Sequence, residues 1–189
     1  MHAFSPDKSW TLFIDRDGIL NRRLENDFVK TPEDFIWNDG ALACLAHSAQ
    51  IFGTIVVVTN QQGIGQGQLA VEQLDAIHRK MLDEAHAAGG RIDRVYFCPD
   101  AEGSQSLCRK PGIGMGLRAR KDFPGIQFRK SVMLGDTLSD MVFGKRLKMK
   151  TILVSAENLV ARRHPALVDL WYPGMHAWLD FMINSQSRI

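Results

Sequence analysis

Residues 12–21 read LFIDRDGILN, and this stretch decides the fold that we expect. The apolar residues 10–14 predict a short buried strand, and Asp17-Gly18 predicts a turn directly after it. Such a strand carries Asp15 and Asp17 to its carboxyl end, where ligands bind in open α/β sheets. Two carboxylates held close together tend to bind a hard cation or to keep one proton. An acidic turn without a function gives the same short pattern, so the residues downstream must decide between the two interpretations.

The composition is that of an ordinary globular chain of 189 residues, of which 45% are hydrophobic and 23% charged. This length predicts one domain, 1–189, with a full-sized core. A formal net charge of +2 gives no reason to expect a nucleic acid or a membrane as partner. Residues 1–9 contain no hydrophobic signal core, and Cys44, Cys98 and Cys108 are too scattered for a disulfide framework. We therefore expect a cytoplasmic protein, a monomer or weak homodimer, whose partner is a small molecule.

Strands and helices alternate along the chain. Residues 54–58 read TIVVV, which is β-branched without alternation, as expected when both faces of a parallel sheet are covered. The sequence TPED at 31–34 is a helix-start signal. Further strands are predicted at 94–97, 131–134 and 151–154, and helices at 41–50, 71–88, 111–121, 138–147, 162–170 and 175–184. This order predicts an α/β fold, with a doubly wound, mostly parallel sheet of five or six strands and helices on both faces.

Reactive side chains follow several of the predicted strands. They include carboxylates, a hydroxyl, an amide and a cation, namely Asp15, Asp17, Thr59, Asn60, Lys110, Asp136 and Asp140. The ends of parallel strands lie at one edge of the sheet, so we expect these side chains to converge. The set suits phosphoryl transfer, in which Mg²⁺ and a lysine neutralise phosphate oxygens while an aspartate attacks phosphorus.

Four segments carry a resemblance to a known family. They are DRDG at 15–18, TNQ at 59–61, RKP at 109–111 and GDTLSD at 135–140. In order and placement they resemble the four motifs of the haloacid-dehalogenase-like phosphohydrolases, which implies the Rossmann-like fold of that family. More narrowly, DRDGxxN, TNQxGI and CRKP resemble the branch of histidinol phosphatases and heptose bisphosphate phosphatases. One such motif is weak evidence, but four in order after the right elements are strong evidence.

The resemblance implies a role for each matching residue. Asp15 resembles the nucleophile that becomes an aspartyl-phosphate, and Asp17 resembles the general acid and base. Mg²⁺ is implied as cofactor, held by the side chains of Asp15 and Asp136 and by the backbone carbonyl of Asp17. Thr59 joins Asp15, Asp17 and Lys110 as a catalytic residue. The substrate contacts that we expect are Arg16, Asn60, Gln61, Arg109 and Lys110. For Asp140 two interpretations stay open: support of the metal site or Lys110, or a carboxylate that interacts with a helix dipole.

The loop before Lys110 departs from this branch, whose members often hold zinc with CxH followed by CxC. The equivalent segments here are Cys98-Pro99-Asp100 and Ser106-Leu107-Cys108. Two thiolates and at best one carboxylate make a poor structural zinc site. We therefore expect no structural zinc, and we expect interactions other than a metal to hold this loop.

The spans between the motifs leave no room for a cap domain, so the site should be capless and shielded only by the loops 20–35, 61–69 and 98–110. The expected reaction is hydrolysis of a small phosphomonoester, in particular a sugar phosphate such as a heptose 1,7-bisphosphate. Histidinol phosphate is the alternative, since acids in the loops (Glu25, Asp27, Glu33 and Asp34) suit a cationic substrate. An alternative from another class is a protein that binds a phosphate ligand and has lost turnover.

Overall fold

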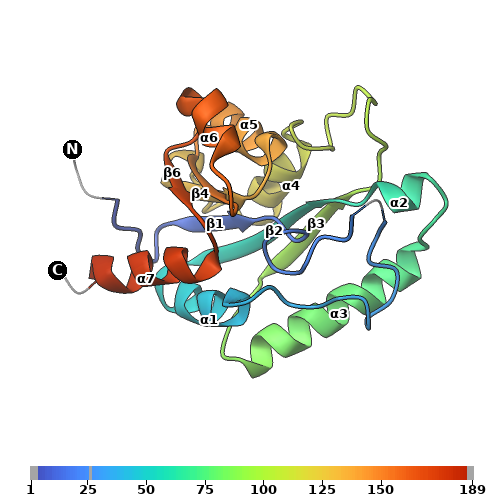
Figure 1. Cartoon of the computed structure of the whole chain (residues 1–189), viewed down its shortest axis with the longest axis horizontal. Helices are drawn as coiled ribbons and strands as arrows, with labels where there is room; N and C mark the ends of the chain where they lie inside the picture. Colours follow the sequence, from blue (N-terminus) through green and yellow to red (C-terminus); the bar gives the residue numbers. More distant parts are fainter. Residues whose placement is uncertain (1–3, 26, 187–189) are drawn as a thin grey trace.

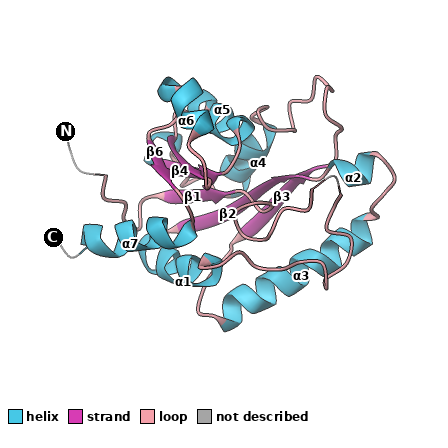
Figure 2. Cartoon of the chain, in the orientation of Figure 1, coloured by secondary structure: helices cyan, strands magenta, loops and turns pink. Residues whose placement is uncertain are grey.

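A parallel sheet of six strands organises the computed structural model, which describes residues 4–25 and 27–186 (Figures 1 and 2). The strand order is β3-β2-β1-β4-β5-β6. The strands are β1 Thr11–Ile14, β2 Thr54–Asn60, β3 Arg94–Cys98, β4 Ser131–Gly135, β5 Lys150–Val154 and β6 Leu170–Tyr172. From β1 the chain first adds β2 and β3 on one side and then β4, β5 and β6 on the other. The predicted doubly wound α/β fold is confirmed.

Helices cover both faces of this sheet (Figure 1). One face carries α1 Ala41–Ile51, α3 Val71–Ala87 and α7 Met175–Gln186, and the other carries α4 Gly114–Asp122 and α5 Leu138–Arg146. Shorter pieces are α2 Gln62–Gly65, α6 Leu159–Arg163 and the 3-10 turns η1 Phe128–Lys130 and η2 Pro165–Leu167. None of the helices in the described ranges has the length and apolar character that crossing a membrane requires.

The central strand β1 contributes side chains to two hydrophobic cores. Leu12 and Ile14 lie in the core beneath α1, α3 and α7, whereas Phe13 lies in the core beneath α4 and α5. Successive strand residues point to opposite faces, so a strand covered on both sides must be apolar at every position. The same reason explains the unbroken apolar run of β2, where Val56 and Val58 pack with Phe13.

Three local predictions were wrong. The TPED segment does not start a helix: the backbone N–H groups of Lys30 and Thr31 donate to Asp34 at 3.2 and 3.0 Å, which closes a turn. The predicted helix at 162–170 is instead α6, η2 and the start of β6, and Pro165 opens η2, because proline cannot continue a helix that precedes it. The helix expected from residue 111 begins at Gly114 as α4.

The edge of the sheet where β1, β2 and β4 end is a topological switch point, since β1 pairs with β2 on one side and β4 on the other. Ligands of open α/β sheets bind at such points. The long loop after β1 and α2 lie beside this edge, where a β-carbon on Gly63 would lie 3.1 Å from the Phe28 ring. The fold therefore brings the predicted motifs together at one place.

Candidate active site

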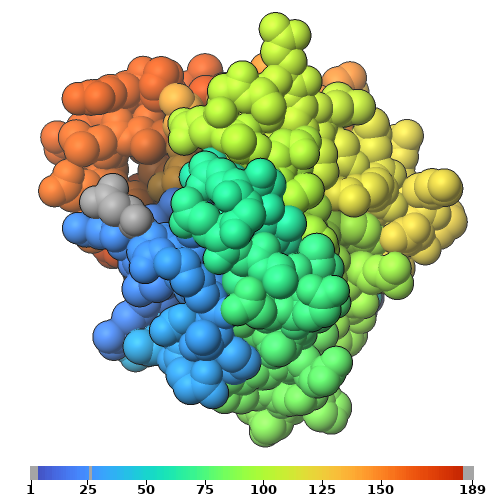
Figure 3. Space-filling view, turned by 90° about the vertical axis from the view of Figure 1, so that its right-hand side faces the viewer, coloured from blue at the N-terminus to red at the C-terminus, as the bar shows by residue number. Residues whose placement is uncertain are grey.

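A cavity of about 800 Å³ lies at the carboxyl ends of β1 and β2. Asp15 follows β1, Thr59 and Asn60 end β2, and Lys110 comes from the loop before α4, and all four line this cavity. Figure 3 shows the side of the molecule where the loop after β1, α2 and the 98–110 loop come together. No further domain covers the cavity among the residues that the structure describes.

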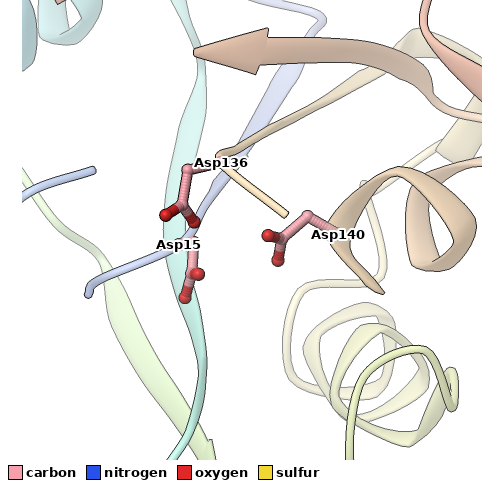
Figure 4. Close-up of side chains that lie close together, drawn as sticks. All are labelled: Asp15, Asp136 and Asp140. Carbon is pink, nitrogen blue, oxygen red and sulfur yellow. The ribbon is translucent and has the colours of Figure 1, made fainter. Parts of the chain in front are cut away.

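Three carboxylates from different elements meet beside this cavity (Figure 4). Asp15 follows β1, Asp136 follows β4, and Asp140 lies in the first turn of α5. One oxygen from each carboxylate lies within 4.8 Å of the others. Burial and the neighbouring acids Asp140 and Asp136 raise the pKa of Asp15 to about 7 although Lys110 opposes the shift. Burial and Asp140 likewise raise the pKa of Asp136 to about 6. The cluster therefore holds more negative charge than its protein partners neutralise.

Lys110 joins two of these carboxylates. Its ammonium lies 2.8 Å from Asp15 and 2.6 Å from Asp140, and the lysine is 3% exposed. The side chain of Asn60 fixes the backbone of Lys110, because it accepts from the lysine N–H at 2.9 Å and donates to the lysine carbonyl at 3.1 Å. Burial lowers the pKa of Lys110, but Asp140 and Asp15 outweigh it, so the pKa is raised and the lysine stays charged.

Asp140 has both of the placements that the sequence left open. It lies in the first turn of α5, where its carboxylate accepts from the Thr137 N–H at 3.0 Å and so caps the helix. The other oxygen binds Lys110 and the residue is fully buried. Asp140 therefore connects the start of α5 to the lysine at the cavity.

Asp17 has a different environment from Asp15. The buried guanidinium of Arg16 binds both oxygens of Asp17 at 2.9 Å, and Asn21 and Gln61 donate to the same carboxylate at 3.0 and 2.8 Å. Burial alone raises the pKa of Asp17, but the charge of Arg16 and these hydrogen bonds prevail and hold the pKa below its usual value. The structure thus separates the two aspartates, with Asp15 titrating near neutrality and Asp17 held as an anion.

Two predicted substrate contacts instead have partners within the protein. Arg16 is 1% exposed, and besides Asp17 it donates to Gln61 at 3.1 Å and contacts His78 at 3.2 Å. Gln61 is 3% exposed and also donates to the Thr59 hydroxyl at 2.8 Å. Both residues orient Asp17, and a contact between either and the substrate stays a prediction.

His78 belongs to this network although the sequence gave no reason to include it. It comes from α3 and is buried. Burial and the adjacent Arg16 charge lower the pKa of His78 to about 3. The ring is therefore neutral near pH 7 and accepts a hydrogen bond from the guanidinium.

Arg23 is the second residue that sequence reasoning missed. Its guanidinium donates to the Asp17 backbone carbonyl at 2.8 Å and to both oxygens of Asp136 at 2.9 Å. Gly18, with φ of 96°, makes this approach possible, because a β-carbon there would collide with the Asp136 carboxylate. Arg23 and Asp136 lie 113 residues apart, so no local pattern could have paired them.

Hydrogen bonds hold the 98–110 loop in the structure. The Ser106 hydroxyl bonds the Asp100 carboxylate and accepts from the N–H groups of Cys108 and Arg109 at 3.0 and 3.1 Å. Arg109 donates to the Asp100 carbonyl at 3.2 Å and reaches the cavity wall. Ser106, which stands where the sequence comparison of the loop expects a zinc thiolate, is thus the centre of a hydrogen-bonded turn. The prediction that the loop lacks structural zinc remains to be tested.

Comparison with known proteins decides the family. D-glycero-alpha-D-manno-heptose-1,7-bisphosphate 7-phosphatase of Mycobacterium bovis is 36% identical over 132 residues, which is 70% of this chain and 70% of that protein. The chain belongs to the HAD-like hydrolases. The HAD-hydrolase-like family model itself matches residues 107–166, which include Lys110, Asp136 and Asp140.

Further HAD-like relatives agree over more of the chain. The D-glycero-beta-D-manno-heptose-1,7-bisphosphate 7-phosphatase of Helicobacter pylori is 31% identical over 154 residues, 81% of this chain and 87% of that protein. The crystal structure of D,D-heptose 1,7-bisphosphate phosphatase from B. bronchiseptica, complexed with magnesium and phosphate, superposes with a TM-score of 0.80 at 26% identity. That match covers 93% of this chain and 98% of the other. The chain is therefore a HAD-type phosphatase, which confirms the expected enzyme class.

Proposed function

We propose that this HAD-type phosphatase hydrolyses a heptose 1,7-bisphosphate, or a closely similar sugar phosphate, in a Mg²⁺-dependent reaction through a phosphoryl group on Asp15. The observation that carries the proposal is the cluster of Asp15, Lys110, Asp136 and Asp140 at the carboxyl ends of β1 and β4, with Asp17 beside it. The substrate class follows from the similarity to heptose-1,7-bisphosphate 7-phosphatases. We also propose that the enzyme is cytoplasmic and that it is a monomer or a weak homodimer.

The donor set fits a divalent cation. Asp15 and Asp136 are carboxylates whose pKa values are raised by burial and by the negative charges around them, so a cation there relieves repulsion. Carboxylate and carbonyl oxygens are the ligands that Mg²⁺ prefers, and the Asp17 carbonyl lies beside Asp136, since one guanidinium reaches both. When bound, Mg²⁺ supplies positive charge that stabilises the phosphoryl oxygens.

Asp15 is placed to act as the nucleophile. Its carboxylate lines the cavity and is oriented by the Arg16 N–H at 2.8 Å and by Lys110. A carboxylate oxygen of Asp15 forms the new bond to phosphorus as the bond to the sugar oxygen breaks. Lys110 neutralises charge on the transferred group while Asp140 holds the lysine in place.

Asp17 handles the proton in both steps. A protonated Asp17 gives its proton to the leaving sugar oxygen, and the resulting carboxylate then takes a proton from the water that attacks the phosphoryl group. Arg16 favours the anionic form in the free protein, and a phosphate entering beside Asp17 raises its pKa and so restores the proton. Thr59 lies 3.4 Å from Asp17, and its hydroxyl offers the incoming phosphate a hydrogen bond.

A bisphosphate suits the shape of the site. A second cavity of about 380 Å³ adjoins the first and shares Asn60, Lys110 and Arg109 with it. One phosphate at Asp15 therefore leaves room for a distant second phosphate, for which Arg109 is the predicted contact. The shared lining also contains Glu102, whose negative charge restricts where an anionic group can lie.

A substrate panel tests the proposal. Phosphate release is measured with Mg²⁺ and with EDTA on both anomers of heptose 1,7-bisphosphate, on hexose monophosphates and on histidinol phosphate. We expect the highest kcat/KM with one heptose bisphosphate anomer and no release in EDTA. Equal, slow turnover of all compounds contradicts the sugar specificity, and preference for histidinol phosphate replaces it with the alternative substrate.

A further inference from the structure

Arg23 holds the two groups that the proposed cation also needs. A single nitrogen of its guanidinium donates to the Asp17 carbonyl at 2.8 Å and to both Asp136 oxygens at 2.9 Å. The carbonyl and the carboxylate are the ligands that the proposed function assigns to Mg²⁺, together with Asp15. A donor nitrogen and a bound metal ion cannot occupy one place between the same oxygens. Arg23 and the cation therefore exclude each other there.

The arginine is free to leave this place. Its side chain is 48% exposed whereas that of Asp136 is 17% exposed, so only the carboxylate end of the pair is fixed. Within the described residues, the hydrogen bonds of the Arg23 side chain go to the Asp136 carboxylate and the Asp17 carbonyl, and the charges of Asp15 and Asp17 also attract it. Arg23 also lines the cavity with Lys110 and Arg109. A guanidinium displaced from Asp136 remains at the cavity wall, where a planar cation binds a phosphate well.

We propose that Arg23 is an internal competitor of the metal ion: it occupies the oxygens of Asp17 and Asp136 in the metal-free protein and transfers to an anionic group of the substrate when the cation binds. The inference rests on the proposed Mg²⁺-dependent function. It adds a residue that couples metal binding to substrate binding, because each cation-bound site releases one arginine for the substrate.

The test is Mg²⁺ affinity, measured by calorimetry in the absence of substrate. Arg23→Gln removes the competing charge and keeps much of the side-chain length. We expect it to bind Mg²⁺ about 5- to 30-fold more tightly than the wild type, because no partly buried ion pair has to be broken. Arg22→Gln is the matched control: it makes the same charge change at the preceding residue, whose hydrogen bonds among the described residues involve its backbone. We expect its affinity to lie within about twofold of wild type, since exposed charges are screened.

Steady-state kinetics at saturating Mg²⁺ give the second readout. Arg23→Gln should raise the KM of the bisphosphate about tenfold or more, with a smaller change in kcat, because a charge-assisted contact to the substrate is lost. Unchanged or weaker Mg²⁺ binding by Arg23→Gln overturns the competition, and an unchanged KM overturns the transfer to substrate. If the wild type itself binds no Mg²⁺, the proposed metal-dependent function fails, and this inference fails with it.

Discussion

Removing the buried lysine of the site should cost more stability than any surface ion pair. Lys110→Met leaves Asp15 and Asp140 without the ammonium that lies 2.8 and 2.6 Å from them, and both residues are buried, at 5% and 0% exposure. Breaking a buried ion pair on one side typically costs about 3–5 kcal/mol. We therefore expect a loss of about 3–5 kcal/mol in the free energy of unfolding at pH 8 with EDTA.

The loss of unfolding free energy in Lys110→Met should grow as the pH rises. Without Lys110 the pKa of Asp15 rises above its present value of about 7, so the native variant takes up a proton that the unfolded chain releases. Each such proton changes stability by up to about 1.4 kcal/mol per pH unit, so the loss should be smaller at pH 5.5 than at pH 8. Urea unfolding at both values measures it.

Lys145→Met is the matched control for this experiment. Lys145 pairs with Asp169 at an equally short 2.7 Å, but the two side chains are 27% and 25% exposed. Its loss should cost at most about 1 kcal/mol. A Lys110→Met variant that loses no more than this control, or that loses the same amount at both pH values, refutes the assignment of Lys110 as the buried counter-charge.

Three further predictions concern charge and the loop. Without Mg²⁺, the free energy of unfolding should fall as the pH rises from about 4 to 7, because native Asp15 and Asp136 keep protons that the unfolded chain releases. Urea unfolding measures this decline, which should be shallower in Asp136→Asn. Arg16→Met should lower kcat about 100-fold with little change in Mg²⁺ affinity, since it frees Asp17 from its clamp without touching the acidic cluster, and unchanged kcat contradicts this. Zinc analysis should find none bound by the wild type, while a variant carrying Asp100→His and Ser106→Cys should gain zinc; zinc bound by the wild type contradicts the loop interpretation.

The parts of the fold that depend on burial alone could be read from the sequence. The run TIVVV predicted the inner strand β2 because a strand covered on both faces must be apolar throughout. The edge strand β6, Leu170–Tyr172, was missed because it has three residues, all half-buried, and carries no such pattern. The turn at 31–34 was mistaken for a helix start because a proline followed by acids suits both, and only the placement of Asp34 decides.

Some residues of the site could be predicted from the sequence, and others could not. The sequence identified Asp15, Lys110 and Asp136, because those residue types follow strands that must end at one edge. It could not predict that Arg16 points inward to Asp17 and His78, since this depends on how α3 packs beside β1. Contacts between distant segments are fixed by the packed structure, and no spacing in the chain records them.

The most direct test of the central claim is to locate the phosphoryl group on the enzyme. Asp17→Asn should still bind Mg²⁺ and substrate. It should transfer the phosphoryl group slowly, because the leaving oxygen receives no proton, and it should not activate water, so the phosphorylated enzyme should accumulate during a long incubation with substrate. Intact-mass and peptide mass spectrometry of the quenched variant should find one phosphoryl group, on Asp15. A phosphoryl group on another residue such as Asp136, or an Asp15→Asn enzyme that retains substantial Mg²⁺-dependent turnover, would contradict the account.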